Sequence, residues 1–284
     1  MCSHQNRVNR VEVPFADGLV FDTLVAGPDN GDVVVLLHGF PQSATIWRPP
    51  LEALATAGYR AVAFDQRGYS PGARPEGKEQ YRIAHLVDDV LGVANHFGAE
   101  RFSVVGHDFG AVVAWQLAAH HTGRIRSLTA LSVPHPVAFA MALAGLSGDQ
   151  RERSSYVSFF QRAEVAEDAL LSGGLAVMLG ASGYPGDIDE RVRAMTEPGA
   201  LTAALNWYRA LDFTLVRGVG AIPVPTLYIW STGDVALGRE GAEGTASYVT
   251  GPYRFEVLEG VSHWIPEEVP ETLNRLLLGH LAAQ

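Results

Sequence analysis

The sequence is poor in three features that would place it in a narrow class: cysteine, charge and long apolar runs. Cys2 is the only cysteine among 284 residues, so the chain can form neither a disulfide framework nor a cysteine-based zinc site. This usage is typical of a reducing compartment, and we expect a cytoplasmic protein.

Charge is also scarce and mostly negative. Charged residues make up 18% of the chain, and 31 acidic residues against 21 basic ones give a formal net charge of -10. Such a balance repels phosphate backbones and anionic membrane surfaces, so nucleic acid is not an expected partner. The 47% hydrophobic content is enough for a large core, which excludes a wholly disordered chain.

No apolar run approaches the ~18 residues of a membrane-spanning helix. The nearest, Pro136 to Leu146, is too short, and Met1 to Arg7 lacks the apolar core of a signal peptide. We therefore expect a soluble, intracellular protein with no membrane partner.

Strand-like and helical patterns alternate through the first half of the chain. Two predicted strands, 9–14 and 19–26, flank Asp17-Gly18, a strong signal for a hairpin turn. Val33 to Leu37 lacks polar alternation, as expected of a strand buried on both faces. Shorter apolar runs predict strands at 60–64, 102–105 and 128–133, and apolar spacing predicts helices at 83–97 and 111–120. This order predicts an α/β protein whose mainly parallel sheet is flanked by helices.

The alternation stops after Pro134-His135-Pro136. From there to about Gly220 the patterns are helical, with no strand-like run, and strands resume at 225–230 and 253–258 before a closing helix near 270–283. The sequence therefore predicts a core formed by residues 1–136 and 222–284, interrupted by an all-helical segment at 137–221, which we call the lid.

The segment most informative about chemistry is Gly106-His107-Asp108-Phe109-Gly110. It follows a predicted strand and precedes a predicted helix, with small residues two positions on either side of Asp108. That is the layout of a sharp nucleophile turn, with aspartate where hydrolases usually carry serine. Taken alone, the motif is also compatible with an ordinary glycine turn.

Three further features support a catalytic interpretation. His38-Gly39-Phe40-Pro41 follows a buried strand, so the backbone N–H of Phe40, with that of Phe109, can form an oxyanion hole. Asp234 and His263 each follow a predicted strand, and the order nucleophile, acid, histidine is the one that this turn predicts. Singly, they would be a surface carboxylate and a structural histidine. Pro134-His135-Pro136 offers no alternative acid after the strand at 128–133.

With these motifs, the chain resembles the epoxide hydrolase branch of the α/β-hydrolase superfamily over nearly its whole length. The resemblance implies an α/β-hydrolase fold and two lid tyrosines that hold and protonate the epoxide oxygen. Ser155 to Gln161 is similar to the segment that bears the first, and Asn206 to Arg209 to the segment that bears the second, which implies that Tyr156 and Tyr208 are the acids. Singly, either tyrosine is more often a packing residue. Substrate contacts are implied for His38, Pro41, Trp207 and Trp264.

The sequence departs from this family at two places. Phe109 stands where relatives commonly have tryptophan, which bears on the lining of the pocket. Arg162-Ala163-Glu164 lacks a Pro-Gly pair that many relatives have there, which bears on the local geometry of the lid.

The implied chemistry suits an aspartate, which is ionised at neutral pH and needs no base to attack. Asp108 would open a small hydrophobic epoxide to give a hydroxyalkyl ester, and water activated by His263 and Asp234 would release a vicinal diol. No metal or organic cofactor has a role in this scheme. A homodimer remains open.

Three alternatives remain. A haloalkane or haloacid dehalogenase would use the same ester chemistry but needs halide-binding donors, or an arginine after the nucleophile; Phe109 supplies neither, although Trp207 could hold a halide. A serine esterase is disfavoured because Ser103 lies before the turn. A ligand-binding protein could reuse the fold without catalysis.

Overall fold

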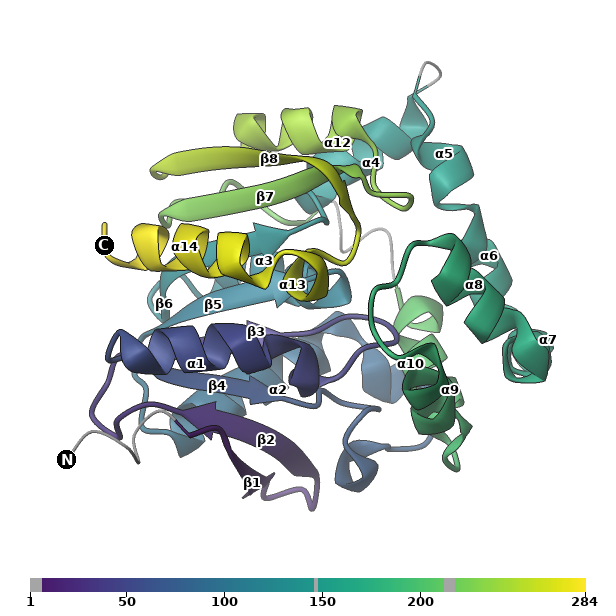
Figure 1. Ribbon diagram of the computed structural model, residues 1–284, viewed down its shortest axis with the longest axis horizontal. Coiled ribbons are helices and arrows are strands. Elements are labelled where there is room, and N and C mark those ends of the chain that lie inside the picture. The colour runs from purple at the N-terminus through teal and green to yellow at the C-terminus, as the bar shows by residue number, and fades with distance from the viewer. Residues whose placement is uncertain (1–6, 146–147, 212–217) are drawn as a thin grey trace.

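The computed structural model describes residues 7–145, 148–211 and 218–284, which contain an eight-stranded sheet (Figure 1). The strands lie in the order β1-β2-β4-β3-β5-β6-β7-β8. Their bounds are β1 Asn9–Pro14, β2 Val20–Ala26, β3 Val33–Leu37, β4 Arg60–Phe64, β5 Phe102–His107, β6 Ile125–Leu131, β7 Thr226–Gly233 and β8 Tyr253–Ser262. β2 runs antiparallel to β1 and β4, and the remaining pairs are parallel. The predicted fold class is confirmed.

Helices cover both faces of the sheet. Those of the core are α1 Arg48–Thr56, α2 Ile83–His96, α3 Phe109–His120, α12 Arg239–Gly244, α13 Ile265–Glu268 and α14 Pro270–Leu281. In Figure 1, α1, α13 and α14 lie in front of the sheet, and α2 and α3 lie behind it. The short turns η1 Ala44–Trp47, η2 Pro71–Ala73, η3 Lys78–Tyr81 and η5 Thr245–Tyr248 join core elements.

Strand β3 shows how the sequence produces this layering. All five of its residues are buried. Side chains alternate along a strand, so Val33, Val35 and Leu37 enter the core with α2 and α3, whereas Val34 and Leu36 enter the core with α1 and α14. An uninterrupted apolar run is therefore what a central strand with two covered faces requires.

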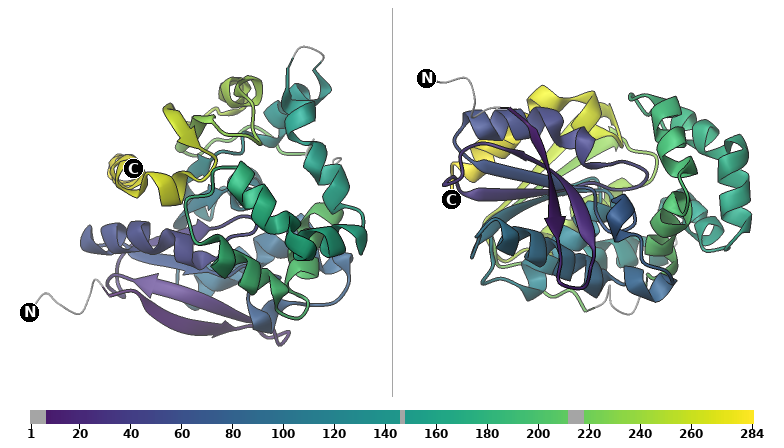
Figure 2. Two further views of the ribbon diagram at one scale, coloured as in Figure 1. Left: turned by 45° about the vertical axis from the view of Figure 1, so that its right-hand side comes forward. Right: turned by 90° about the horizontal axis from the view of Figure 1, so that it is seen from below.

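The lid lies over the carboxyl ends of the parallel strands, as the right-hand view in Figure 2 makes clear. Its helices are α4 Pro136–Ala144, α5 Gln150–Arg153, α6 Ser155–Phe160, α7 Val165–Ala169, α8 Leu175–Ala181, α9 Ile188–Thr196 and α10 Ala200–Arg209, with the turn η4 at Leu170–Gly174. α4 packs against α12 of the core, where Gly241 faces Ala138 and Ala142. The division of the chain at 136/137 and 221/222 stays a prediction.

Several strand bounds differ from those predicted, and β5 and β7 extend to His107 and Gly233. β6 spans Ile125–Leu131 rather than 128–133, because Ser132 turns out of the strand with φ 65°. The exposed Arg126 hides the start of this strand in the sequence. β8 continues past Leu258 to Ser262, and α1 was not predicted.

Within the described ranges, no helix combines the length and apolar character needed to cross a membrane.

Candidate active site

Asp108 occupies a strained turn between β5 and α3. Its backbone has φ 53° and ψ -123°, a region that costs a non-glycine residue about 1–3 kcal/mol. The flanking glycines allow the close approach that the turn needs. A Cβ on Gly106 would lie 2.3 Å from the carbonyl oxygen of Gly110, and a Cβ on Gly110 would lie 2.3 Å from that of Leu37. The turn holds the Asp108 carboxylate at the carboxyl edge of the sheet, beneath the lid.

Backbone N–H groups meet the Asp108 carboxylate. The amide of Phe40 donates to Oδ1 at 2.9 Å, and the backbone amide of Phe109, next along the chain, helps to lower the pKa of this carboxyl. These are the two residues that the sequence suggested for an oxyanion hole. In the resting protein both amides stabilise the carboxylate, and that of Phe40 points at an oxygen that would carry charge during hydrolysis of an ester.

His263 lies between two carboxylates. Its Nδ1 is 2.8 Å from Oδ2 of Asp234, and its Nε2 is 3.5 Å from Oδ2 of Asp108. Asp234 is held in turn by the backbone amides of Ala236 and Leu237, which donate to Oδ1 at 2.8 and 3.0 Å. The second carboxylate thus fixes the ring so that its other nitrogen faces the nucleophile.

Electrostatics favour an ion pair between His263 and Asp108. Burial alone would raise the pKa of Asp108, but its hydrogen bond to His263 and the charge on that ring hold the pKa below its usual range. Burial alone would lower the pKa of His263, but the charge of Asp234 and the hydrogen bond to Asp108 raise it to about 10. The nucleophile is therefore ionised, and the histidine is charged as long as Asp108 is charged.

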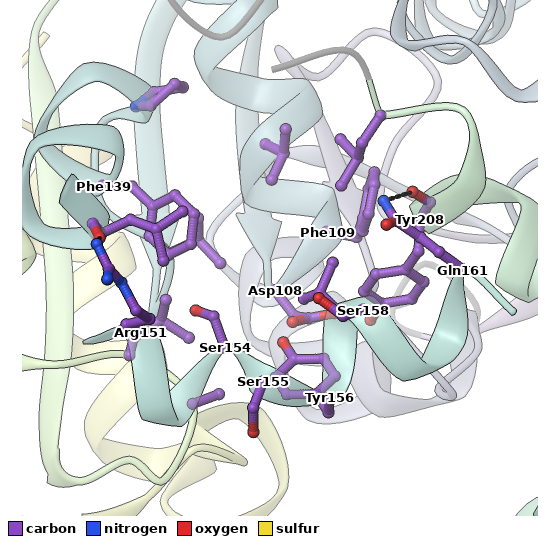
Figure 3. Close-up of a pocket in the computed structure, with 18 residues that line it drawn as sticks. Asp108, Phe109, Phe139, Arg151, Ser154, Ser155, Tyr156, Ser158, Gln161 and Tyr208 are labelled. Carbon is purple, nitrogen blue, oxygen red and sulfur yellow. Dashed lines mark hydrogen bonds between the residues drawn. The ribbon is translucent and has the colours of Figure 1, made fainter. Parts of the chain in front are cut away.

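Tyr156 of α6 and Tyr208 of α10 face the nucleophile from the lid. Their ring centroids are 6.2 Å apart, and both rings line the same cavities as Asp108. Burial raises the pKa of each phenol well above 10, and the Asp108 charge raises it further. Both phenols are therefore protonated and able to donate hydrogen bonds. Figure 3 shows Tyr156, Asp108 and Tyr208 side by side.

Two cavities meet at these three residues. The larger, of about 240 Å³, is mostly apolar and extends over Phe109 toward Phe139, with Arg151 in its wall (Figure 3). The smaller, of about 140 Å³, reaches His263 and Trp264. Their shared wall consists of Asp108, Tyr156, Tyr208 and Ala236. A ligand held at Asp108 can thus extend in two directions.

Three of the four residues suggested for substrate contact do not line these cavities. His38 is fully buried and bonds to backbone groups of Gly39 and Gln66. Pro41 is buried after a cis peptide bond, and the indole N–H of Trp207 donates to the carbonyl of Arg67 at 2.7 Å. They support the walls from behind. Trp264 does line the smaller cavity.

Sequence reasoning missed a polar cluster behind His263. His107 contacts the His263 carbonyl oxygen and one end of the Gln42 amide, and the other end of that amide contacts the Glu267 carboxyl. His107 and Gln42 sit in or directly after the motifs already singled out, so their positions offered a signal. Glu267 offered none. In the part of the chain that the structure describes, no three His, Cys, Asp or Glu side chains gather as a metal site would need.

Comparison with known proteins agrees with this geometry. A family described as alpha/beta hydrolase fold matches residues 32–169. The chain is 36% identical to the "AB hydrolase superfamily protein YfhM" of Bacillus subtilis, over 94% of this chain and 96% of that one. It is 34% identical to "Epoxide hydrolase A" of Mycobacterium tuberculosis, over 93% and 95%. The crystal structure of Epoxide Hydrolase A from Mycobacterium thermoresistibile has a TM-score of 0.83 at 29% identity, covering 97% of this chain and 98% of that one.

Fold, nucleophile turn and relatives together define an α/β hydrolase. Within that superfamily the chain belongs to the epoxide hydrolase branch, and the family predicted from the sequence is confirmed.

Proposed function

We propose that this protein is an epoxide hydrolase that converts an epoxide and water to a vicinal diol through an ester on Asp108. The observation that carries the proposal is the meeting of an ionised carboxylate and two protonated phenols at one cavity junction. This combination does not suit a serine hydrolase. The serine nucleophile must first be deprotonated by a base, and its leaving group departs from the acyl enzyme, whereas an opened epoxide keeps its oxygen on the substrate and needs an acid there.

The first half-reaction uses Asp108 and the two tyrosines. A carboxylate oxygen of Asp108 attacks one epoxide carbon, forming a C–O ester bond and breaking the C–O bond of the strained ring. The electron pair of the broken bond stays on the epoxide oxygen, which receives hydrogen bonds from Tyr156 and Tyr208 and then a proton from one of them. That tyrosine is left as a phenolate. General-acid help of this kind contributes about 10²–10⁴-fold.

The second half-reaction uses His263 and Asp234. Once Asp108 is an ester it is neutral, so His263 keeps only the charge of Asp234 to stabilise its proton. That proton returns to the phenolate left by the first half-reaction, which restores the tyrosine and leaves His263 neutral. The neutral ring, oriented by Asp234, takes a proton from water, which attacks the ester carbonyl. The N–H groups of Phe40 and Phe109 stabilise the oxyanion, and its collapse releases the diol and restores Asp108.

The cavities favour a small hydrophobic epoxide. The larger chamber is walled by apolar side chains such as Phe109, Val133 and Phe139, and it opens directly onto the junction. Aryl and alkyl epoxides match this lining.

A cytoplasmic location and a homodimer stay predictions.

Dehalogenase activity is disfavoured by the indole N–H groups. Those of Trp207 and Trp264 are bonded to Arg67 and Ser182, and those of Trp115 and Trp230 to backbone carbonyls. Trp47 is buried with the helices on the opposite face of the sheet. A halide leaving the substrate carbon that Asp108 attacks would therefore meet no free indole donor, and Phe109 offers neither an indole nor an arginine.

The proposal is tested with the His263→Gln variant, a panel of aryl and alkyl epoxides, and intact mass. The variant should gain the mass of one whole epoxide and form no diol, whereas Asp108→Ala should gain nothing. Adducts from haloalkanes alone, with halide released, would make the protein a dehalogenase. Saturable ligand binding without an adduct or turnover from any of these compounds would make it a binding protein.

A further inference from the structure

A chain of hydrogen bonds runs from His263 away from the substrate side; it is buried at His107 and Gln42 and half-buried at Glu267. Nε2 of His107 lies 2.8 Å from the His263 carbonyl oxygen, and Nδ1 lies 2.9 Å from the Gln42 side chain. The other end of the Gln42 amide meets the carboxyl of Glu267 in α13. Nothing in the proposed reaction uses these three side chains directly, yet they connect a carboxyl group to the backbone of the base.

One end of this chain fixes where the hydrogens are. A carbonyl oxygen only accepts, so Nε2 of His107 must carry a hydrogen. The same carbonyl accepts a hydrogen bond from the Ser132 hydroxyl at 3.2 Å. The other ring nitrogen, Nδ1, is free to donate or to accept, and the orientation of the Gln42 amide decides which. The O and N of an amide have nearly the same shape, so charge and burial must assign them.

Two arrangements hold the same number of protons. In the first, Glu267 is ionised and accepts from the amide N–H₂ of Gln42, so the amide oxygen faces Nδ1 and His107 must be a cation. In the second, the neutral Glu267 carboxyl donates to the amide oxygen, and the amide N–H₂ donates to Nδ1 of a neutral His107. They differ in which end of the chain carries the proton.

Burial favours the second arrangement. His107 is fully buried beside the charged His263, and burial lowers its pKa to about 4. Burial raises the pKa of Glu267 to about 7, although Tyr184, Gln42, Arg191 and His263 all act to lower it. When the proton stays on the carboxyl, the cost of placing a charge on the fully buried His107 ring is avoided.

We propose that Glu267 holds the proton of this chain, and that Gln42 and His107 pass its protonation state to the backbone of His263. Glu267 is then a positioning residue for ester hydrolysis, a role that rests on the proposed function.

Loss of that proton has a defined consequence. An ionised Glu267 draws the amide N–H₂ of Gln42 toward itself, and the amide oxygen then faces a lone pair on Nδ1 of His107. The chain loses one hydrogen bond, and the ring that holds the His263 carbonyl is less firmly fixed. Glu267 is neutral below its raised pKa and ionised above it, so ester hydrolysis should slow as the pH rises through about 7.

The kinetic test follows single-turnover ester hydrolysis from pH 5.5 to 9. In the wild type, the rate should fall above pH 7. Glu267→Gln keeps a donor for the Gln42 oxygen but cannot ionise, so its rate at pH 6 should stay close to that of the wild type and the fall should vanish. Glu267→Leu breaks the chain and should slow hydrolysis on the order of tenfold at every pH. The rate of ester formation should change little in either variant.

The spectroscopic test needs no substrate. In ¹⁵N-histidine NMR of the free protein at pH 6, His107 should be neutral with hydrogen on Nε2, and Glu267→Gln should keep that state at pH 8.5. A doubly protonated His107 at pH 6, or identical pH profiles for wild type and Glu267→Gln, would overturn the proposal. Failure of every epoxide to form an ester would instead overturn the proposed function. The NMR result would still show which residue of the hydrogen-bond chain holds the proton.

Discussion

Nε2 of His263 lies 3.5 Å from Oδ2 of Asp108, close enough for the two side chains to form an ion pair. The other ring nitrogen of His263 contacts Asp234. Each charge stabilises the other in the resting protein. Formation of an ester removes the Asp108 charge and leaves His263 with one carboxylate partner. The nucleophile thereby controls when the histidine can act as a base.

This coupling predicts different pH dependences for the two half-reactions. The pKa of Asp108 lies below its usual range, so ester formation should persist into acidic solution. The pKa of His263 is about 10 only while Asp108 is charged, and it falls in the ester, where hydrolysis needs the neutral ring. Hydrolysis should therefore slow as the pH falls, and ester should accumulate.

Rapid quenching followed by intact mass measures the ester fraction during turnover. The fraction should be larger at pH 5 than at pH 7. Equal fractions at the two values would mean that the loss of charge on Asp108 does not govern His263.

The two tyrosines should matter for ester formation and little for ester hydrolysis. Tyr156→Phe and Tyr208→Phe each remove one hydroxyl that lines both cavities. The double variant should form ester at least about 10²-fold more slowly, because no acid remains for the epoxide oxygen. Stopped-flow single turnovers resolve the two steps. Equal slowing of both steps would indicate that the rings only support the lid.

A reciprocal clasp holds the two tyrosine segments together. Gln161 donates to the Tyr208 carbonyl at 3.2 Å (Figure 3), and Nε of Arg209 donates to the Phe160 carbonyl at 3.1 Å. Arg209 is also paired with Glu167 through both of its terminal nitrogens. These contacts join α6 to α10, so they fix the distance between the phenols.

Gln161→Leu should therefore slow ester formation on the order of tenfold and lower the free energy of unfolding by about 1 kcal/mol. Ser172→Ala, on the exposed turn η4, is the matched lid control and should do neither. Stopped-flow kinetics and urea unfolding give the two quantities. A loss of stability with unchanged ester formation would show that the clasp does not position the phenols.

Phe109 should set the size of substrate that the larger cavity admits. Its ring packs against Trp207 and Tyr208, with centroids 4.8 and 5.3 Å away, and it forms part of the cavity wall. Phe109→Trp adds bulk there and should raise KM for bulky aryl epoxides more than for small alkyl epoxides. The ratio of kcat/KM between the two classes measures this. An unchanged ratio would place the aryl group in the other cavity.

Local patterns predicted most of the fold. The parallel core follows from buried strands such as β3 and β4, and the hairpin follows from Asp17-Gly18 between β1 and β2. These features depend on periodicity and turn chemistry within a few residues. β6 was misplaced because the polar pair Arg126-Ser127, with Arg126 exposed, interrupts the apolar pattern near its start.

Within the site, the residues at strand ends could be predicted because a parallel sheet brings those ends to one edge. The sequence could not show which way the side chains of His38 and Trp207 point. Both make hydrogen bonds to the backbone behind the cavity, so neither reaches the substrate side as suggested. The chain through Gln42 to Glu267 was out of reach for another reason. It joins residues 225 positions apart, and the side-chain orientations that make the contact come only from tertiary packing.

The central claim is that Asp108 forms a covalent ester, and a single turnover in water enriched in ¹⁸O tests it most directly. With enzyme in excess over a hydrophobic epoxide, the oxygen added to the substrate should come from the Asp108 carboxylate. The diol should then be unlabelled, and the peptide that contains Asp108 should gain one ¹⁸O atom. A diol labelled in its first turnover, with Asp108 unlabelled, would show that water attacks the epoxide directly and would contradict the account.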